Sequence, residues 1–418
     1  MNSINSRMQL LAAQLNGYLR KTIYLLMFAA GSVMASEINI TARFLPNANN
    51  PDVNKFENTT ANSGYCAIYP ARCTGGIFSI SIPNVTWHHT MKKGQNVGIR
   101  VPYAWRELQV THSDGSTQTV KVRIVGLGAN YRIEPNVLNI TGFSSSEAGR
   151  AHDALWGGLG WIVSPAGCTS TYFGAFTPTY FTFFWLFNSA NTCAKTSSYD
   201  VYPGVYFSNI NIMYEMQTPN PLAMSMGTYR GKLNYTFGAN GDFAFSTSGT
   251  ADPNVTLNFT LSVQHQLRVQ FPPATNHLAL APEGGWQQWI YNGASQLPKK
   301  LLANQPYQLW SSTRFKMQLR CQYSVGNDCA LQNDYGDTQV PVKTAVTLPY
   351  GMQDSSNKTV NRYPLSNSTA SIFKPTRYVS DERAVLHFEV EKSGVEQMVN
   401  SGGGRFRGNV TVIWDSEI

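Results

Sequence analysis

The feature that most constrains the fold of this chain is a strict alternation of apolar residues that occurs in two matching segments. Segment 404–414 aligns without gaps to segment 227–237, and both begin Gly-x-aromatic-Arg-Gly. A period of two places one face of a β-strand against a core. Because the chain contains this strand twice, we expect two β-domains, each finished by such a strand. In the later copy the positions on one face are Phe406, Gly408, Val410, Val412 and Trp414.

Residues 1–35 are typical of a secretory signal peptide. Basic residues precede an apolar stretch at 22–34, and Val33-Met34-Ala35 forms a small-x-small cleavage site before Ser36. The apolar stretch is shorter than the roughly 20 residues that a transmembrane helix requires. An uncleaved anchor is the alternative. We expect export, with no transmembrane segment left after removal of the signal.

All six cysteines lie beyond the predicted signal. An even number in an exported chain indicates disulfides formed in an oxidising compartment. Six cysteines allow 15 pairings, so spacing alone does not determine connectivity. The simplest arrangement joins neighbours, as Cys66–Cys73, Cys168–Cys193 and Cys321–Cys329.

Composition favours an all-β protein and argues against a nucleic-acid partner. The net charge is +8, of which +3 lies in residues 1–35, and only 13% of the residues are charged. No lysine- or arginine-rich tract exceeds two residues. Aromatic residues make up 12% of the chain, with 34 glycines and 21 prolines, as suits many strands and turns. The exported part, about 380 residues, is longer than one core usually supports.

The longest alternating run, 255–271, is interrupted only by His265. At about 3.3 Å per residue it would extend about 56 Å, far beyond a usual strand, so we expect it to cross between sheets or between domains. We place the domain boundary at about residue 250, giving an N-terminal domain at 36–250 and a C-terminal domain at 251–418. Both are predicted to be immunoglobulin-like β-sandwiches, and one short helix is predicted at 146–156.

No motif for catalysis or nucleotide binding is present. The chain lacks G-x-S-x-G, H-E-x-x-H, Walker and G-x-G-x-x-G patterns. His88 and His89 are neighbours, so on a strand they point to opposite faces and make a poor metal site. We expect no catalytic residue, no metal and no cofactor. A secreted carbohydrate-active enzyme stays open as an alternative, because the two carboxylates of a glycosidase can be far apart in sequence.

The chain resembles subunits of chaperone–usher fimbriae. The resemblance rests on an exported, disulfide-containing β chain whose alternating strand, Gly404 to Trp414, lies four residues before Ile418. The two-domain organisation is similar to that of a fimbrial tip adhesin, with a pilin-like second domain that lacks a strand. The pattern departs from that of pilins in that Glu417, rather than an aromatic residue, is penultimate.

The resemblance implies partners and interface residues. A periplasmic chaperone and then a neighbouring fimbrial subunit would each donate a strand to the second domain, and an outer-membrane usher would assemble the fimbrium on the bacterial surface. Phe406, Val410, Val412 and Trp414 would line the groove, and a basic residue of the chaperone would hold the Ile418 carboxylate. An ordinary final strand of a complete domain is the alternative.

The resemblance also implies that the first domain binds a host receptor, either a glycan or a protein. Exposed aromatic faces beside polar groups suit such a site. A structural subunit without receptor binding is the runner-up, and in that case residues 36–44 would insert into another subunit. The candidate ligand-binding residues are Trp87, Trp105, Trp156, Trp161, Tyr172 and Trp185.

Overall fold

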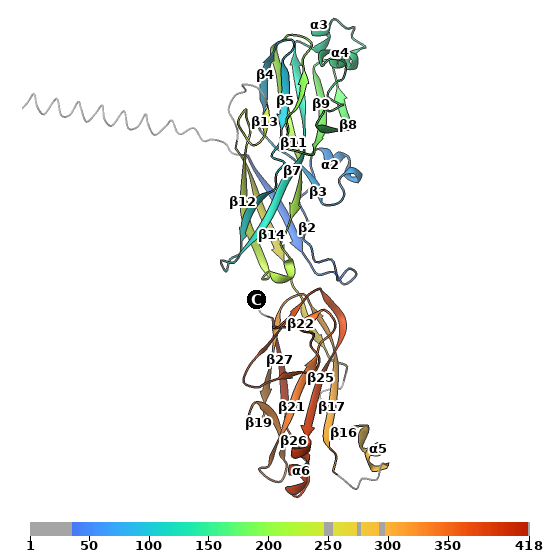
Figure 1. The fold of residues 1–418 in the computed structure, drawn as a ribbon, viewed down its shortest axis with the longest axis vertical. Coiled ribbons are helices and arrows are strands. Elements are labelled where there is room, and N and C mark those ends of the chain that lie inside the picture. Colours follow the sequence, from blue (N-terminus) through green and yellow to red (C-terminus); the bar gives the residue numbers. More distant parts are fainter. Residues whose placement is uncertain (1–35, 246–253, 274–276, 292–296, 417–418) are drawn as a thin grey trace, which may run out of the picture.

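The computed structural model describes residues 36–245, 254–273, 277–291 and 297–416. The predicted signal peptide, the boundary expected near residue 250 and Ile418 lie outside these ranges. The described chain forms two β-sandwich domains placed end to end, so the expected all-β fold is confirmed (Figure 1). No helix in the described ranges is long and apolar enough to cross a membrane.

The first domain is built on an eleven-stranded curled sheet with the path β2-β1-β14-β12-β6-β7-β11-β3, joined by β4, β8 and β9. A three-stranded sheet, β10-β5-β13, accompanies it. The strands are β1 Ser36–Phe44, β2 Glu57–Asn58, β3 Ile77–Ser81, β4 Trp87–Met91, β5 Asn96–Arg100, β6 Arg106–Thr111, β7 Thr117–Glu134, β8 Cys168–Phe176, β9 Tyr180–Phe187, β10 Cys193–Thr196, β11 Val201–Gln217, β12 Gly227–Thr236, β13 Ala244–Phe245 and β14 Asn254–Val263.

The loops of the first domain contain five short helices among the described residues. The predicted helix at 146–156 is present as α4, and α3 and α4 lie at the end of the domain that is remote from the second domain (Figure 1). Asn136 caps α3 by accepting a hydrogen bond from the backbone N–H of Asn139. The helices are α2 Tyr65–Ile68, η1 Pro70–Arg72, α3 Val137–Thr141, α4 Ala148–Leu155 and η2 Pro221–Ala223.

The second domain pairs a nine-stranded sheet with a four-stranded sheet. The first follows the path β15-β17-β25-β21-β20-β19, joined by β16, β23 and β26, and the second follows β22-β24-β18-β27. The elements are β15 Leu267–Gln270, β16 Ala281–Pro282, α5 Gly285–Tyr291, β17 Lys300–Ser311, β18 Phe315–Cys321, β19 Tyr323–Val325, β20 Asp328–Asn333, β21 Gln339–Thr347, β22 Met352–Asp354, β23 Tyr363–Leu365, β24 Ser371–Pro375, β25 Val379–Glu391, α6 Lys392–Asn400, β26 Phe406–Arg407 and β27 Val410–Ser416.

The long alternating run crosses between the domains, as its length predicts. Its first part, β14, pairs with β1 and β12 in the first domain, whereas β15 pairs with β17 in the second. The sheets therefore change between Val263 and Leu267, later than the boundary expected at about 250. The expected boundary placed β14 in the second domain because Gly249 and Pro253 suggested a break in the chain before it. The hydrogen bonds of β14 nevertheless lie in the large sheet of the first domain.

Hydrogen bonds join the two domains at this crossing. The His265 Nε2 atom lies 2.8 Å from the carbonyl oxygen of Met224 in the first domain, and its Nδ1 atom lies 3.3 Å from Ser312 Oγ in the second. The backbone N–H of Tyr378 donates to the carbonyl of Pro51 across the junction at 3.1 Å.

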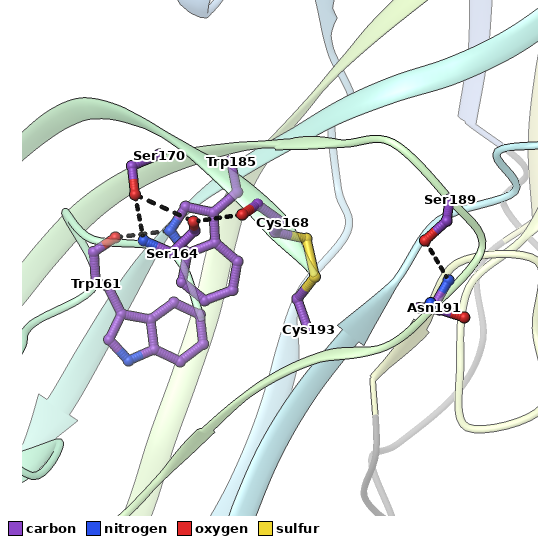
Figure 2. Close-up of a disulfide and its surroundings, with 8 residues drawn as sticks. All are labelled: Trp161, Ser164, Cys168, Ser170, Trp185, Ser189, Asn191 and Cys193. Atoms are coloured by element: carbon purple, nitrogen blue, oxygen red, sulfur yellow. Dashed lines mark hydrogen bonds between the residues drawn. A yellow bond between two sulfur atoms is a disulfide. The ribbon is translucent and has the colours of Figure 1, made fainter. Parts of the chain in front are cut away.

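The disulfides join neighbouring cysteines in all three cases. The pairs are Cys66–Cys73, Cys168–Cys193 and Cys321–Cys329, the simplest arrangement expected from the spacing. Cys168 begins β8 and Cys193 begins β10, so this bond ties the large sheet of the first domain to its small one. In Figure 2 the bond lies beside the Trp161 and Trp185 rings, which stack 4.7 Å apart between centroids.

Candidate functional site: an open groove in the second domain

The C-terminal strand β27 lies at the edge of its sheet. It pairs antiparallel with β18 from Phe315↔Ser416 to Cys321↔Val410, and none of the described strands pairs with its other edge. On the facing sheet, β15 is likewise an edge strand, paired only with β17. The two sheets of the second domain thus end side by side in two incompletely paired strands.

The core of the second domain is partly uncovered between these two edges. Val410, Val412 and Trp414 point inward from β27 but are only half-buried. Leu267 and Val269 on β15 likewise point inward and are half-buried. Residues one strand further in, such as Leu309 and Met317, are fully buried. The half-buried residues form the floor and sides of what we call the acceptor groove: Leu267, Val269, Val410, Val412 and Trp414.

Aromatic side chains meet across the groove between the two edge strands. Ring centroids of Phe271 and Trp414 lie 5.8 Å apart, and Tyr307 lies 5.3 Å and 5.6 Å from these two rings. Phe271 follows β15 and Trp414 belongs to β27, so the cluster bridges the two edges. Beyond it, toward Val410, no described strand spans the gap between the sheets.

The first domain shows how such a gap is filled. There, β12 is the earlier copy of the alternating strand, and β14 pairs with it along its full length from Gly227↔Val263 to Thr236↔Asn254. The other edge of β14 pairs in parallel with β1. The inward residues of β14 are at most 1% exposed: Val255, Leu257, Phe259, Leu261 and Val263. Thus the first domain contains a strand, β14, between β1 and β12, whereas the corresponding place between β15 and β27 of the second domain is open.

The glycines of the shared motif have a common structural reason. A Cβ atom added at Gly231 would lie 2.4 Å from the carbonyl oxygen of Gln109, and one at Gly408 would lie 2.5 Å from that of Ala330. Both positions therefore require the close backbone approach that only glycine permits. The first glycine of each copy, Gly227 or Gly404, has a positive φ.

One expected groove residue lies elsewhere. The predicted continuous strand 404–414 is divided into β26 and β27, and β26 pairs with β20 of the other sheet. Phe406 consequently packs in a separate cluster with Leu301 and Val340, so it does not share a strand with Trp414. The alternation continues across Gly408, and this is why the sequence did not reveal the change of sheet.

Four of the six candidate ligand-binding residues are core residues, so the expectation for them is wrong. Trp161 and Trp185 are fully buried, and the Trp185 Nε1–H donates to the Trp161 carbonyl at 2.8 Å (Figure 2). Trp87 packs against Phe245, with ring centroids 4.2 Å apart. Trp156 is 4% exposed and donates its indole N–H to the hydroxyl of Tyr131. A side chain buried in this way has no surface left for a ligand.

The other two candidates reach the surface of the first domain. Trp105 is half-buried, and the Arg123 guanidinium lies 4.7 Å from its ring. Tyr172 is 72% exposed. The groove residues Leu267 and Val269, and Phe271 beside them, were not among the residues expected from the sequence, although their place in the crossing run 255–271 is the signal that could have identified them.

Comparisons with known proteins give matches only among solved structures. No family model and no curated protein matches the chain. A structure described as a chaperone–tip adhesin complex vital for activation of CFA/I fimbriae biogenesis is 11% identical, covers 92% of this chain and 97% of its own, and has a TM-score of 0.24. A mutant of the CFA/I adhesin CfaE of enterotoxigenic Escherichia coli is 10% identical, covers 92% and 93%, and has a TM-score of 0.25.

A third structure is the CsuC–CsuE chaperone–tip adhesion subunit pre-assembly complex of archaic Csu pili of Acinetobacter baumannii. It is 9% identical, covers 91% of this chain and 99% of its own, and has a TM-score of 0.21. The three descriptions name a tip adhesin, an adhesin and a tip adhesion subunit. Since the TM-scores are below 0.5, the function proposed below rests on contacts within this chain.

Proposed function

We propose that this chain is the tip adhesin of a chaperone–usher fimbrium and that its second domain accepts a strand donated by another protein. The observation that carries the proposal is the unpaired edge of β27 above a half-exposed core. The chain would be exported to the periplasm, bind a chaperone there, pass through an outer-membrane usher and end on the cell surface attached to the next subunit. The proposal assigns no catalytic step to it.

A donated strand would satisfy two physical needs at once. An edge strand leaves a row of backbone N–H and C=O groups without protein partners, and its exposed edge can pair with another chain. Alternate apolar side chains of the donor would cover Val410, Val412 and Trp414, and its backbone would pair with β27. By analogy with β14, a strand in this place would run antiparallel to β27 and parallel to β15.

The tip position is supported by the pairing of β1. Residues 36–44 would be the donor strand of a shaft subunit, but β1 pairs with β14 along its whole length within the first domain. Ile40, Ala42 and Phe44 are at most 3% exposed. Releasing this strand would open the core of the first domain, so a structural subunit that inserts 36–44 into a neighbour is disfavoured.

The acceptor groove can be tested with a synthetic strand. We use a peptide copying residues 254–263 as the probe, because its five alternate apolar residues already fill the equivalent place in the first domain. At 100 times its dissociation constant, a ligand of the folded state adds about 2.7 kcal/mol, or roughly 5–10 °C in the unfolding midpoint of a domain of this size. We expect such a shift for the second domain in calorimetry.

The control peptide has serine at the five apolar positions and the same length. It should leave the midpoint unchanged, because it offers backbone pairing without apolar cover. If neither peptide shifts the transition at millimolar concentration, the second domain is already complete and the proposal fails.

A further inference from the structure

A cleft of about 450 Å³ opens on the flank of the first domain, between β8 and the loop that contains α2 and η1. Its volume falls within the range of small-molecule sites. Apolar side chains form its floor, among them Val125, Leu186 and Met213. Three tyrosines, Tyr65, Tyr103 and Tyr172, line it together with polar groups. This combination of apolar floor, aromatic rings and a few polar groups is the usual composition of a ligand site.

A bulge in β8 presents Tyr172 at the edge of this cleft. The β8–β9 register shifts between Ser170 and Gly174, and Tyr172 has φ +55°, which is uncommon for a bulky residue. The bulge is anchored on both sides of Tyr172. Thr171 Oγ1 donates to the Phe184 carbonyl at 2.6 Å, and the Phe173 ring packs edge-on against Tyr65. Tyr172 is therefore held outward although most of its ring is exposed.

The chain before the bulge is anchored as well. Ser170 Oγ accepts a hydrogen bond from the Ser164 N–H at 2.7 Å, and Ser164 Oγ donates to the carbonyl of Cys168 at 3.0 Å (Figure 2). Cys168 is itself joined to Cys193 by a disulfide. Such rigid support keeps a ring in place before a ligand arrives, which lowers the entropy lost on binding.

Arg72 brings a positive charge to the cleft that no described carboxylate neutralises. Its Nη1 donates to the Thr171 carbonyl at 2.7 Å, and its guanidinium lies 5.6 Å from the centre of the Tyr69 ring. Nη1 also lies 3.5 Å from the Tyr65 hydroxyl, so these contacts orient the side chain, and none of the described residues accepts a hydrogen bond from its Nε or Nη2 atom. A guanidinium in this state is suited to a carboxylate or sulfate, which it can bind through paired hydrogen bonds.

The other charges of the cleft cancel. Glu215 accepts hydrogen bonds from Arg123, with Nε at 2.7 Å and Nη2 at 2.6 Å from the same carboxylate oxygen. The Arg123 guanidinium also lies over Tyr103 and Trp105, at 5.3 Å and 4.7 Å from the ring centres. Arg123 therefore neutralises Glu215, and among the described residues that line the cleft Arg72 is the one cation.

We propose that this cleft binds an anionic sugar unit, with the face of the sugar against Tyr172 and its carboxylate or sulfate against Arg72. Aromatic rings pack against the apolar face of a sugar, while side chains such as Asn188 offer hydrogen-bonding groups for its hydroxyls. This inference rests on the proposed receptor role of the first domain. A ligand can reach this cleft, whereas four of the tryptophans expected to bind it are buried.

The test measures binding of the purified full chain to sialyllactose, lactose 3-sulfate and lactose by calorimetry or ligand-observed NMR. We expect the anionic sugars to bind more tightly than lactose, and the preferred one identifies the acidic group. Arg72→Gln should weaken anionic-sugar binding about tenfold and abolish the preference over lactose. Tyr172→Ala, which leaves the Arg72 contacts in place, should weaken the binding of all three sugars.

Exposed residues of the same kind in the second domain serve as controls. Arg405→Gln and Tyr335→Ala should bind as the unaltered chain does, and thermal unfolding should show that all four variants are folded. If both cleft variants bind normally, or if the chain binds none of these sugars while its fimbriae still attach to host cells, the cleft proposal is overturned and the receptor role stands. If the fimbriae do not attach either, the receptor role itself fails.

Discussion

At the scale of single residues, the imidazole of His152 is fully buried in the first domain and hydrogen-bonded at both ring nitrogens. Its Nε2 atom lies 2.8 Å from the Thr177 carbonyl, so this nitrogen carries the proton. Its Nδ1 then accepts from the Tyr131 hydroxyl at 2.7 Å, and Tyr131 in turn accepts from the Trp156 N–H. A second proton on the ring would break this chain of hydrogen bonds, because Nδ1 could no longer accept.

Acid should therefore destabilise the first domain. Burial lowers the pKa of His152 below the ordinary 6.5, against weaker opposing contributions from Thr177 and Asp153. Below about pH 6.5 the unfolded chain binds a proton at this site that the folded chain does not, so the free energy of unfolding falls by up to about 1.4 kcal/mol per pH unit. The loss begins near pH 6.5 and continues until the folded pKa is reached.

The contribution of this one group is measured by comparing slopes between pH 7 and pH 5 in urea unfolding. His152→Gln should make the pH dependence shallower even though it lowers stability at pH 7. Burial also lowers the pKa of His89, which is not in this network, so some dependence should persist. An identical slope in the variant and the unaltered chain would contradict the assignment.

At the scale of elements, Gly408 determines how the C-terminal strand passes from one sheet to the other. It separates β26, which pairs with β20, from β27, which pairs with β18. The backbone of β20 approaches so closely at Ala330 that a Cβ atom has no room. The start of the groove-lining strand thus depends on this one contact.

Gly408→Ala should lower the stability of the second domain by about 1–3 kcal/mol, because a backbone oxygen must move to admit the methyl group. The matched control is Gly336→Ala, at a position where a Cβ atom meets nothing within 4 Å. That change should stay within about 0.5 kcal/mol. The measurement compares the unfolding midpoints of the second domain in the two variants. Equal midpoints would contradict the prediction, because they would show that the β20 backbone shifts without loss of stability.

The strands also show which features could be predicted from sequence. Alternation in the run 255–271 correctly identified the buried face of β14, because each residue of a strand points opposite to its neighbours. Alternation could not show that four candidate tryptophans are buried, because it does not reveal whether the second face of a strand is also covered by protein. In β9 the consecutive residues Phe183, Phe184 and Trp185 are all buried: Phe184 stacks on Tyr65 of α2, while Trp185 stacks on Trp161.

At the scale of the whole molecule, the two proposed functions, receptor binding and strand acceptance, belong to two β-domains placed end to end (Figure 1). The first domain contains the strand, β14, that closes its sheet, and it carries the cleft. The second domain contains the open groove. The number of domains and the class of fold could be predicted from the repeated strand, but the parallel pairing of β1 with β14 could not, because it joins residues more than 200 positions apart.

The same long-range pairing explains why the domain boundary was misplaced. Local turn signals near 249–253 suggested a break, yet β14 returns to pair with β12 before the chain crosses at His265. The cleft was hidden from sequence for a similar reason. Arg72 and Tyr172 are 100 positions apart and line the same cleft because Arg72, from the disulfide loop, hydrogen-bonds to Thr171 in the β8 bulge.

The measurement that tests the central claim most directly is hydrogen exchange of the backbone amides of β27, with and without the peptide copying residues 254–263. In the free chain, every second amide should exchange quickly, since it faces the unpaired edge, while those of β14, paired on both sides, stay protected. Added peptide should slow the fast set in β27 and leave β14 unchanged. If all amides of β27 are as protected as those of β14 before any peptide is added, the second domain has no open edge and the account is wrong.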